Sequence, residues 1–162
     1  MVKKDPLAHP RRLTVYAYIR DHPGATFREV ARQSGIATGT ARHHLNVLKR
    51  HRVIVQHPHR GTLRFFASQG GHETTWRATV LLREPGLALL HGWLAERQAT
   101  PQKEILVEMA GAQGWSRSTT QHRLQRLEAA GLLRTRMQGR WKLYSGIPVR
   151  EAFHDKEPMP QG

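Results

Sequence analysis

The first apolar stripe of the chain has helical spacing. Its members are Leu13, Val15, Tyr16, Ala17 and Ile19. Residues 21–24 then bring proline and glycine together, and this combination stops a helix. The pattern predicts a helix that ends near residue 21.

Two further helices are expected in the next 25 or so residues. Thr26 and Glu29 have the spacing of a capping box, which predicts a short helix that begins directly after Thr26. Ala41, Leu45 and Leu48 then recur at i, i+4 and i+7. Because charged and polar residues fill the positions between them, we expect a helix with one packed face and one exposed face.

A β-hairpin is expected after the third helix. Residues 53–55 and 63–66 are rich in β-branched and aromatic side chains, and the segment 56–62 between them is polar and contains glycine. The predicted order is helix, helix, turn, helix and hairpin, with a basic hairpin tip.

The chain repeats this pattern. Residues 36–48 align without a gap on residues 115–127, and threonine, histidine and two leucines recur in register. Gly61 then matches Gly139 if the second connection is one residue shorter. Upstream, the expected pairs are Leu13 with Leu87, Tyr16 with Leu90, and Thr26 with Thr100.

The second copy has its own expected helix signals. Thr100 is expected to cap a helix that has Pro101 at its first position, and Ser116 to cap the next one. The second copy is longer around residues 109–114, where a longer helix and a wider loop are expected.

These patterns divide the chain into five segments. We expect a basic N-terminal arm at 1–10, a first domain at 11–67 and a linker with a short helix at 68–84. A second domain is expected at 85–147 and a disordered tail at 148–162.

Composition narrows the function. The chain of 162 residues has 26 Lys and Arg against 12 Asp and Glu, a formal charge of +14, and no cysteine. Such an excess favours a polyanionic partner, because neutralising phosphates releases condensed counterions. No apolar run approaches a membrane span and no secretory signal is evident, so we expect a cytoplasmic, nucleoid-associated protein that does not bind membranes.

Each copy resembles a winged helix-turn-helix domain. Residues 40–48 are similar to the recognition-helix segment of ArsR-like regulators, and residues 116–124 to that of MarR-like and archaeal regulators. Residues 127–133 resemble the passage from recognition helix to wing, whereas residues 49–52 depart from it by adding charge where the family has an acidic or small residue and glycine. The resemblance implies a mainly α fold with small β hairpins, built from two tandem winged helix-turn-helix domains.

The resemblance also implies which residues meet DNA, since the third helix of this class enters the major groove and the wing follows the backbone. On the two helices these residues are Thr38, Gly39, Thr40, Arg42, His43 and Asn46, and Arg117, Ser118, Gln121, His122 and Gln125. On the wings they are His57, His59 and Arg60, and Arg136 and Arg140. From residues 49–52 we expect phosphate contact at most.

Individual roles stay open at this point. Arg42 suits a bidentate contact to guanine, but a plain phosphate contact is an equal alternative. Gln121 suits adenine, and Gly39 lets the backbone approach phosphate. The second domain, with a net charge of about +4 over residues 82–162 against about +10 over residues 1–81, is either a second reading head or an orienting or dimerising unit.

We expect double-stranded DNA as the partner and transcriptional regulation as the role. No nucleotide-binding or nucleophile motif is present, so no catalysis and no cofactor are expected. The His57–His59 and His43–His44 pairs suggest a metal sensor, but adjacent helical residues point apart and no acidic cluster accompanies them, so no metal site is expected. The alternative functions are a protein-interaction or architectural adaptor without base specificity, and RNA binding. The alternative to a monomer is a homodimer. No small-molecule ligand is evident.

Overall fold

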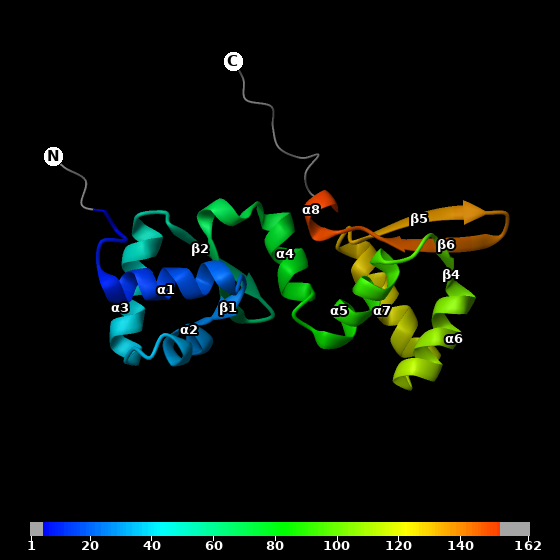
Figure 1. The fold of residues 1–162 in the computed structure, drawn as a ribbon, viewed down its shortest axis with the longest axis horizontal. Coiled ribbons are helices and arrows are strands. Elements are labelled where there is room, and N and C mark those ends of the chain that lie inside the picture. The colour runs from blue at the N-terminus through cyan, green and yellow to red at the C-terminus, as the bar shows by residue number, and fades with distance from the viewer. Residues whose placement is uncertain (1–4, 153–162) are drawn as a thin grey trace, which may run out of the picture. The chain divides into compact units, whose positions relative to one another are not determined.

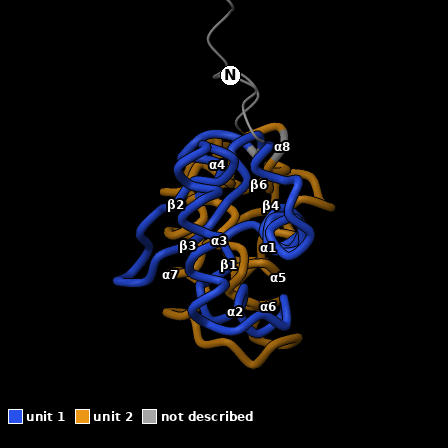
Figure 2. Tube along the Cα trace, turned by 90° about the vertical axis from the view of Figure 1, so that its left-hand side faces the viewer, with its two compact units in different colours: residues 1–76 blue, residues 77–162 orange. Residues whose placement is uncertain are grey.

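The computed structural model describes residues 5–152 of the chain. It divides into two compact units, residues 1–76 and residues 77–162 (Figure 2). The boundary falls inside helix α4 (Glu73–Leu81), within the segment predicted as the linker. No helix among the described residues is long and apolar enough to cross a bilayer.

Among its described residues, unit 1 contains three α-helices, a 3-10 helix, a three-stranded sheet and the first turn of α4 (Figure 1). Its elements are α1 (Pro10–Asp21), β1 (Ala25–Thr26), α2 (Phe27–Gln33), α3 (Thr38–Arg50), β2 (Ile54–His59), β3 (Thr62–Ala67) and the 3-10 helix η1 (Ser68–Gly70). The antiparallel strands lie in the order β1-β3-β2. The two-residue strand β1 adds a third strand to the predicted hairpin. The sequence pattern did not predict this strand.

Unit 2 follows the same order of elements after the rest of α4 (Figure 1). They are α5 (Pro85–Ala95), β4 (Thr100–Pro101), α6 (Gln102–Gln113), α7 (Arg117–Ala129), β5 (Leu133–Gln138), β6 (Trp141–Gly146) and α8 (Val149–Ala152). Its antiparallel sheet has the order β4-β6-β5, which corresponds strand for strand to that of unit 1.

The second half of each unit repeats without any gap. α3 and α7, β2 and β5, and β3 and β6 have equal lengths, and each pair begins 79 residues apart. The expected match of Gly61 with Gly139 is therefore wrong by one residue. The two-residue turn Arg60-Gly61 corresponds to Gly139-Arg140, because a glycine can occupy either position of such a turn.

The match of the first helices was also wrong by one residue. α1 and α5 both begin with proline, and their buried pairs are Val15 with Ile19 and Leu90 with Leu94. Leu13, by contrast, leaves 48% of its surface exposed. Matching leucine to leucine misled the alignment, because the β-branched Val15 and Ile19 occupy the core positions in unit 1.

The capping predictions had mixed outcomes. Thr26 and Glu29 form the expected capping box, and the Ser116 hydroxyl accepts a hydrogen bond from the Thr119 amide at 3.1 Å. Thr100 does not cap a helix: it lies in β4, its hydroxyl donates to the Gln98 carbonyl, and Pro101 is the N-cap residue of α6.

α6 is longer than α2, as expected, but the loop that follows it does not widen: residues 114–116 stand where unit 1 has residues 34–37.

The segments at the two ends of the chain are partly described. In the predicted disordered tail, residues 149–152 form the short helix α8, whose Val149 and Ala152 pack against the core of unit 2. That part of the prediction is wrong, because these apolar side chains find a surface to cover. Residues 153–162 of the tail, and residues 1–4 of the predicted arm, lie outside the described residues.

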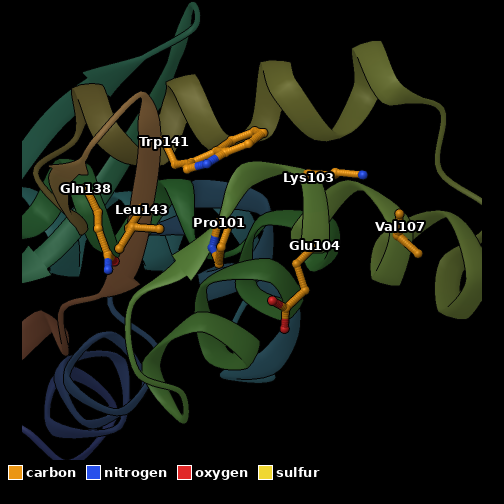
Figure 3. Close-up of a pocket in the computed structure, with 7 residues that line it drawn as sticks. All are labelled: Pro101, Lys103, Glu104, Val107, Gln138, Trp141 and Leu143. Atoms are coloured by element: carbon orange, nitrogen blue, oxygen red, sulfur yellow. The ribbon is translucent and has the colours of Figure 1, made fainter.

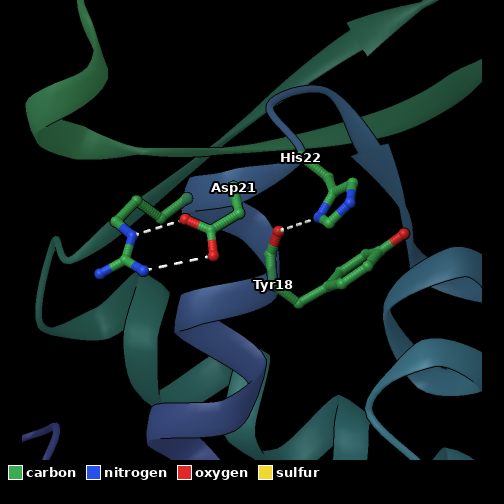
Figure 4. A network of polar contacts seen from close by, with 4 residues as sticks. Tyr18, Asp21 and His22 are labelled. Atoms are coloured by element: carbon green, nitrogen blue, oxygen red, sulfur yellow. Dashed lines mark hydrogen bonds and ion pairs between the residues drawn. The ribbon is translucent and has the colours of Figure 1, made fainter.

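α1 ends where the sequence predicted. The His22 amide donates to the Tyr18 carbonyl at 2.9 Å. The His22 ring stacks on the Tyr18 ring with 4.3 Å between centroids, and its Nδ1 lies 3.1 Å from the same carbonyl (Figure 4). Arg20 pairs with Asp21 at 2.8 Å, and this hydrogen bond lowers the pKa of the Asp21 carboxyl. The last turn of α1 is thus closed by local contacts before Pro23 and Gly24.

The turn from helix to hairpin is the same in both units. After α3, Arg52 has φ 57°, and the Val53 amide donates to the Leu48 carbonyl at 2.9 Å. After α7, Gly131 has φ 72°, and the Leu132 amide donates to the Leu127 carbonyl. This is the geometry of a left-handed helix C-terminus, which glycine adopts freely and arginine only with strain.

We expect Arg52→Gly to stabilise unit 1 by about 0.5 to 1 kcal/mol, because relief of the left-handed strain exceeds the entropy that glycine loses on folding. The reciprocal change Gly131→Arg should destabilise unit 2 by about 1 kcal/mol, since a Cβ at Gly131 meets no atom within 4 Å and only the backbone conformation resists it. Urea unfolding followed by circular dichroism measures both. Equal losses in the two variants would contradict this explanation.

Candidate nucleic-acid interface

One face of α3 is packed and the other is open. Ala41, Leu45 and Leu48 are buried against the core of unit 1. The opposite face carries Gly39, Arg42, His43 and Asn46 at i, i+3, i+4 and i+7, and all four are exposed. Five of the six helix residues predicted for this domain are exposed, Thr38 being the fifth, while Thr40 is half-buried.

The beginning of α3 is suited to an anion. Ala37, its N-cap residue, provides no side-chain hydrogen bond, and the first turn carries no acidic residue. The first intrahelical bond runs from the Ala41 amide to the Ala37 carbonyl, so the helix leaves its first amides for an outside acceptor. Amides at a helix N-terminus, together with the positive end of the helix dipole, favour phosphate.

Arginines from α2 extend this positive surface. A hollow of about 820 Å³ lies between α2 and the start of α3, and Arg28, Arg32 and Arg42 line it, with Glu29 as the acidic member. The Arg42 guanidinium lies 5.5 Å from the centroid of the Phe27 ring, a contact that limits its freedom. Sequence reasoning missed Arg28 and Arg32; their i, i+4 spacing on a predicted helix is the signal that could have found them.

The first wing, residues 54–67, ends in a tight turn. Arg60 has φ 47° and Gly61 φ 74°, so both central residues are left-handed, as a type I′ hairpin turn requires. Arg60 is exposed at this tip, while His57 and His59 are half-buried along β2. Asparagine would suit the backbone at position 60 better than arginine, so this turn holds Arg60 in a strained left-handed conformation.

α7 presents the corresponding face in unit 2. Ser118, His122 and Gln125 are exposed along it, Gln121 is half-buried, and Arg117 is exposed at its start. Ser118 is partly engaged, because its hydroxyl lies 3.0 Å from that of the capping Ser116. The face therefore carries fewer charges than that of α3.

Two ion pairs hold the end of α7 within unit 2. Arg126 makes two bonds of 2.6 Å to the Glu84 carboxylate, and this hydrogen bonding raises the pKa of Arg126. The Lys142 ammonium reaches the Glu128 carboxylate at 2.8 Å, which raises the pKa of Lys142. These charges have partners inside the unit, and the exposed cations nearest the wing tip are Arg136 and Arg140.

The second wing, residues 133–146, turns differently from the first. Gly139 has φ 59° at the first turn position, and Arg140 follows it with ordinary backbone geometry, as in a type II′ turn. The Arg140 guanidinium lies 5.1 Å from the centroid of the Trp141 ring. The sequence placed Trp141 in a strand but gave it no role, although an exposed tryptophan beside a wing tip is unusual.

His44 lies under the open face of α3. Only 3% of its surface is exposed, and neither ring nitrogen has a hydrogen-bond partner among the described residues. Its ring centroid is 4.9 Å from that of His9 and 5.6 Å from that of His43. Burial lowers the pKa of His44, and the neighbouring His9, Arg12, His43 and Arg11 lower it further. Within the described residues, no group of three or more His, Asp or Glu side chains could hold a metal ion.

A comparison with protein families finds a match that covers most of unit 1. A family model described as an N-terminal HTH (helix-turn-helix) domain matches residues 9–79. The matched segment runs from the start of α1 into α4. It supports a winged helix-turn-helix DNA-binding fold, and such a domain suggests DNA binding with a regulatory role.

No curated protein matches the chain. Among solved structures, the chain is similar to the DIP2311 protein from Corynebacterium diphtheriae, with 20% sequence identity and a TM-score of 0.30. The match covers 85% of this chain and 26% of that protein's chain.

We expect the buried His44 to make unit 1 sensitive to acid. Its pKa is lower in the fold than the ordinary value of 6.5, so the unfolded chain binds more protons as the pH falls below 6.5. The stability that is complete above this pH is therefore lost progressively during acidification. We expect His44→Leu to remove part of this loss, and to raise the free energy of unfolding by about 1 kcal/mol even at neutral pH because a buried donor no longer lacks a partner.

Urea unfolding between pH 5 and pH 8 tests this expectation. His51→Leu is the control, because His51 is exposed at the C-cap of α3. If His44→Leu keeps the acid sensitivity of the original chain, His44 is not its source.

Proposed function

We propose that the chain is a sequence-specific double-stranded DNA-binding protein and a transcriptional regulator that acts by binding, without catalysis. The observation that carries this proposal is the exposed face of α3. Its polar residues line up over a buried apolar stripe, so the helix can enter a major groove while it stays anchored to the core. The family match over residues 9–79 supports DNA binding from independent evidence.

Specificity and affinity are proposed to come from different parts of unit 1. Arg42, His43 and Asn46 face outward from α3 and would meet base edges. The amides at the start of α3, the α2 arginines and the tip of the first wing would hold phosphates. Because phosphate contacts carry no sequence information, removing one should weaken binding to all sequences alike.

Unit 2 is proposed as the second of two tandem winged helix-turn-helix domains, 11–67 and 85–147. Its support is the equal lengths and constant spacing of the helix, turn and hairpin in both units. Gln121, His122 and Gln125 would read bases from α7, with Arg117, Arg136 and Arg140 on phosphates. The resemblance to ArsR-like and MarR-like regulators and a cytoplasmic, nucleoid-associated location belong to the same proposal.

An architectural or adaptor role is the second candidate. The observation that favours it comes from unit 2, where Val107, Met137 and Trp141 are the most exposed large apolar side chains of the described residues. In this alternative α3 contacts only phosphates and bases are not distinguished. A homodimer is compatible with either function.

Arg42→Ala and Arg60→Asn should have different effects on DNA binding. Arg42→Ala is expected to cost about 1–3 kcal/mol on the preferred site and to relax base preference there. Arg60→Asn suits the type I′ turn and so should leave folding intact, yet it should weaken all duplexes and lower the slope of log K against log salt by about 1. Fluorescence anisotropy with a preferred and a random duplex measures both effects.

Arg20→Gln is the matched control, because it removes the same charge at the end of α1, where Arg20 pairs with Asp21. It should change neither specificity nor salt slope by a comparable amount. If Arg42→Ala weakens preferred and random duplexes equally, Arg42 is a phosphate contact and not a reading residue.

Selection from a random duplex pool tests the function as a whole. A recovered motif with two separate conserved parts supports two reading domains, and a motif with one part supports unit 1 alone. Binding without any motif supports the architectural alternative. The absence of a salt-sensitive shift of duplex DNA at low ionic strength excludes DNA binding and leaves the protein-interaction adaptor.

A further inference from the structure

Unit 2 has a large aromatic ring exposed at its surface, whereas such rings are usually buried in a protein core. Trp141, at the start of β6, leaves 51% of its surface exposed, and Val107 on α6 leaves 66%. Figure 3 shows both residues lining a groove between α6 and the second wing, together with Lys103 and Leu143. A large aromatic ring normally stabilises a protein by burial, so a ring held open beside a groove indicates a ligand.

The groove consists of two hollows, and Trp141 and Val107 line both of them. A hollow of about 590 Å³ reaches toward Gln138 and Leu143, and a second of about 650 Å³ reaches toward Arg117 and Arg140. Trp141, Val107 and Lys103 line both hollows. Each hollow has the size of a small-ligand site, and the tryptophan lies where they meet.

The charge of the second hollow identifies the class of ligand. Lys103, Arg117, Arg140 and Lys142 line it, and no acidic side chain of the described residues does. Glu104 lines only the first hollow, which it shares with Lys103, and Lys142 shares its charge with Glu128. A flat aromatic surface beside three or four cations is complementary to a flat ring attached to phosphates.

We propose that this groove binds an unpaired nucleobase of a DNA strand by stacking it on Trp141. A base within a duplex has both faces covered by its neighbours, so only an unpaired or extruded base can offer a face to the indole. Arg140, 5.1 Å from the Trp141 ring centroid, and Arg117 hold the flanking phosphates. Gln138, which pairs with Trp141 across the hairpin, carries amide groups for the base edge.

Unit 1 lacks this platform at the corresponding positions. With the constant spacing of 79 residues, Gly61, Thr62 and Leu63 stand where unit 2 has Arg140, Trp141 and Lys142. The site therefore goes beyond the duplex binding proposed for the chain as a whole. It gives unit 2 a second ligand, an unpaired base in its groove, besides the duplex proposed for α3 and α7.

Binding of the full chain to oligothymidylate and to an abasic oligonucleotide of equal length separates stacking from charge, because both probes carry the same phosphates. We expect the full chain to prefer oligothymidylate and its tryptophan fluorescence to be quenched on binding. Trp141→Leu should reduce affinity for oligothymidylate about 5- to 100-fold and leave the abasic probe nearly unchanged. Trp141→Phe, which keeps an aromatic face, should recover most of the loss.

Met137→Ala is the matched control, because it removes another exposed apolar side chain from the same wing at a position that lines neither hollow. It should bind both probes as the unchanged chain does. The proposal is overturned if Trp141→Leu keeps the preference for oligothymidylate, if Met137→Ala loses it equally, or if no preference exists. Duplex binding measured in parallel distinguishes failure of the groove from failure of the proposed function, since only the latter abolishes the duplex shift.

Discussion

The turn between helix and hairpin is the constraint on which each unit depends. In both units a leucine carbonyl in the last turn of the helix accepts the amide of the first apolar residue after the turn, Leu48 from Val53 and Leu127 from Leu132. A left-handed residue, Arg52 or Gly131, reverses the chain between them. Since both leucines are fully buried, the direction in which the wing leaves the helix is fixed by the core of its own unit.

Because this geometry is shared, the differences between the units arise from side chains. Unit 1 gathers its cations on α2, on the open face of α3 and at a wing tip whose turn strains Arg60. Unit 2 pairs Arg126 and Lys142 internally and replaces the first wing's Thr62 with an exposed tryptophan. The same frame thus carries a charged surface in one unit and an aromatic groove in the other. The formal charge of +14 predicts the charged surface of unit 1 and gives no sign of the aromatic groove of unit 2.

Prediction from sequence succeeded where a local rule decides the structure. The capping box at Thr26, the cap at Ser116 and the buried stripe of α3 each follow from spacing alone. It failed where tertiary contacts decide. Thr100 has the composition of a cap, but it lies one residue before the N-cap Pro101 and pairs with Tyr144 in β4, as Ala25 pairs with Phe65 in β1. The groove beside Trp141 could not be predicted, because α6 and β6 are brought together only by the fold, and the tryptophan alone reads as an ordinary strand residue.

A basic side chain under the helix is the last feature that the units share. His44 and Arg123 are 79 residues apart and occupy the same position on α3 and α7, and each has a side-chain nitrogen that is buried without a partner in the described structure. Burying such a group costs stability unless its charge is removed or compensated. Unit 2 compensates by laying the Arg123 guanidinium 3.8 Å from the centroid of the Trp115 ring. Unit 1 has Ile36 in the place of Trp115, and there burial lowers the pKa of His44 and so disfavours the charged imidazolium instead. One structural position therefore has two electrostatic solutions, a charge that an aromatic ring compensates in unit 2 and a charge that burial disfavours in unit 1.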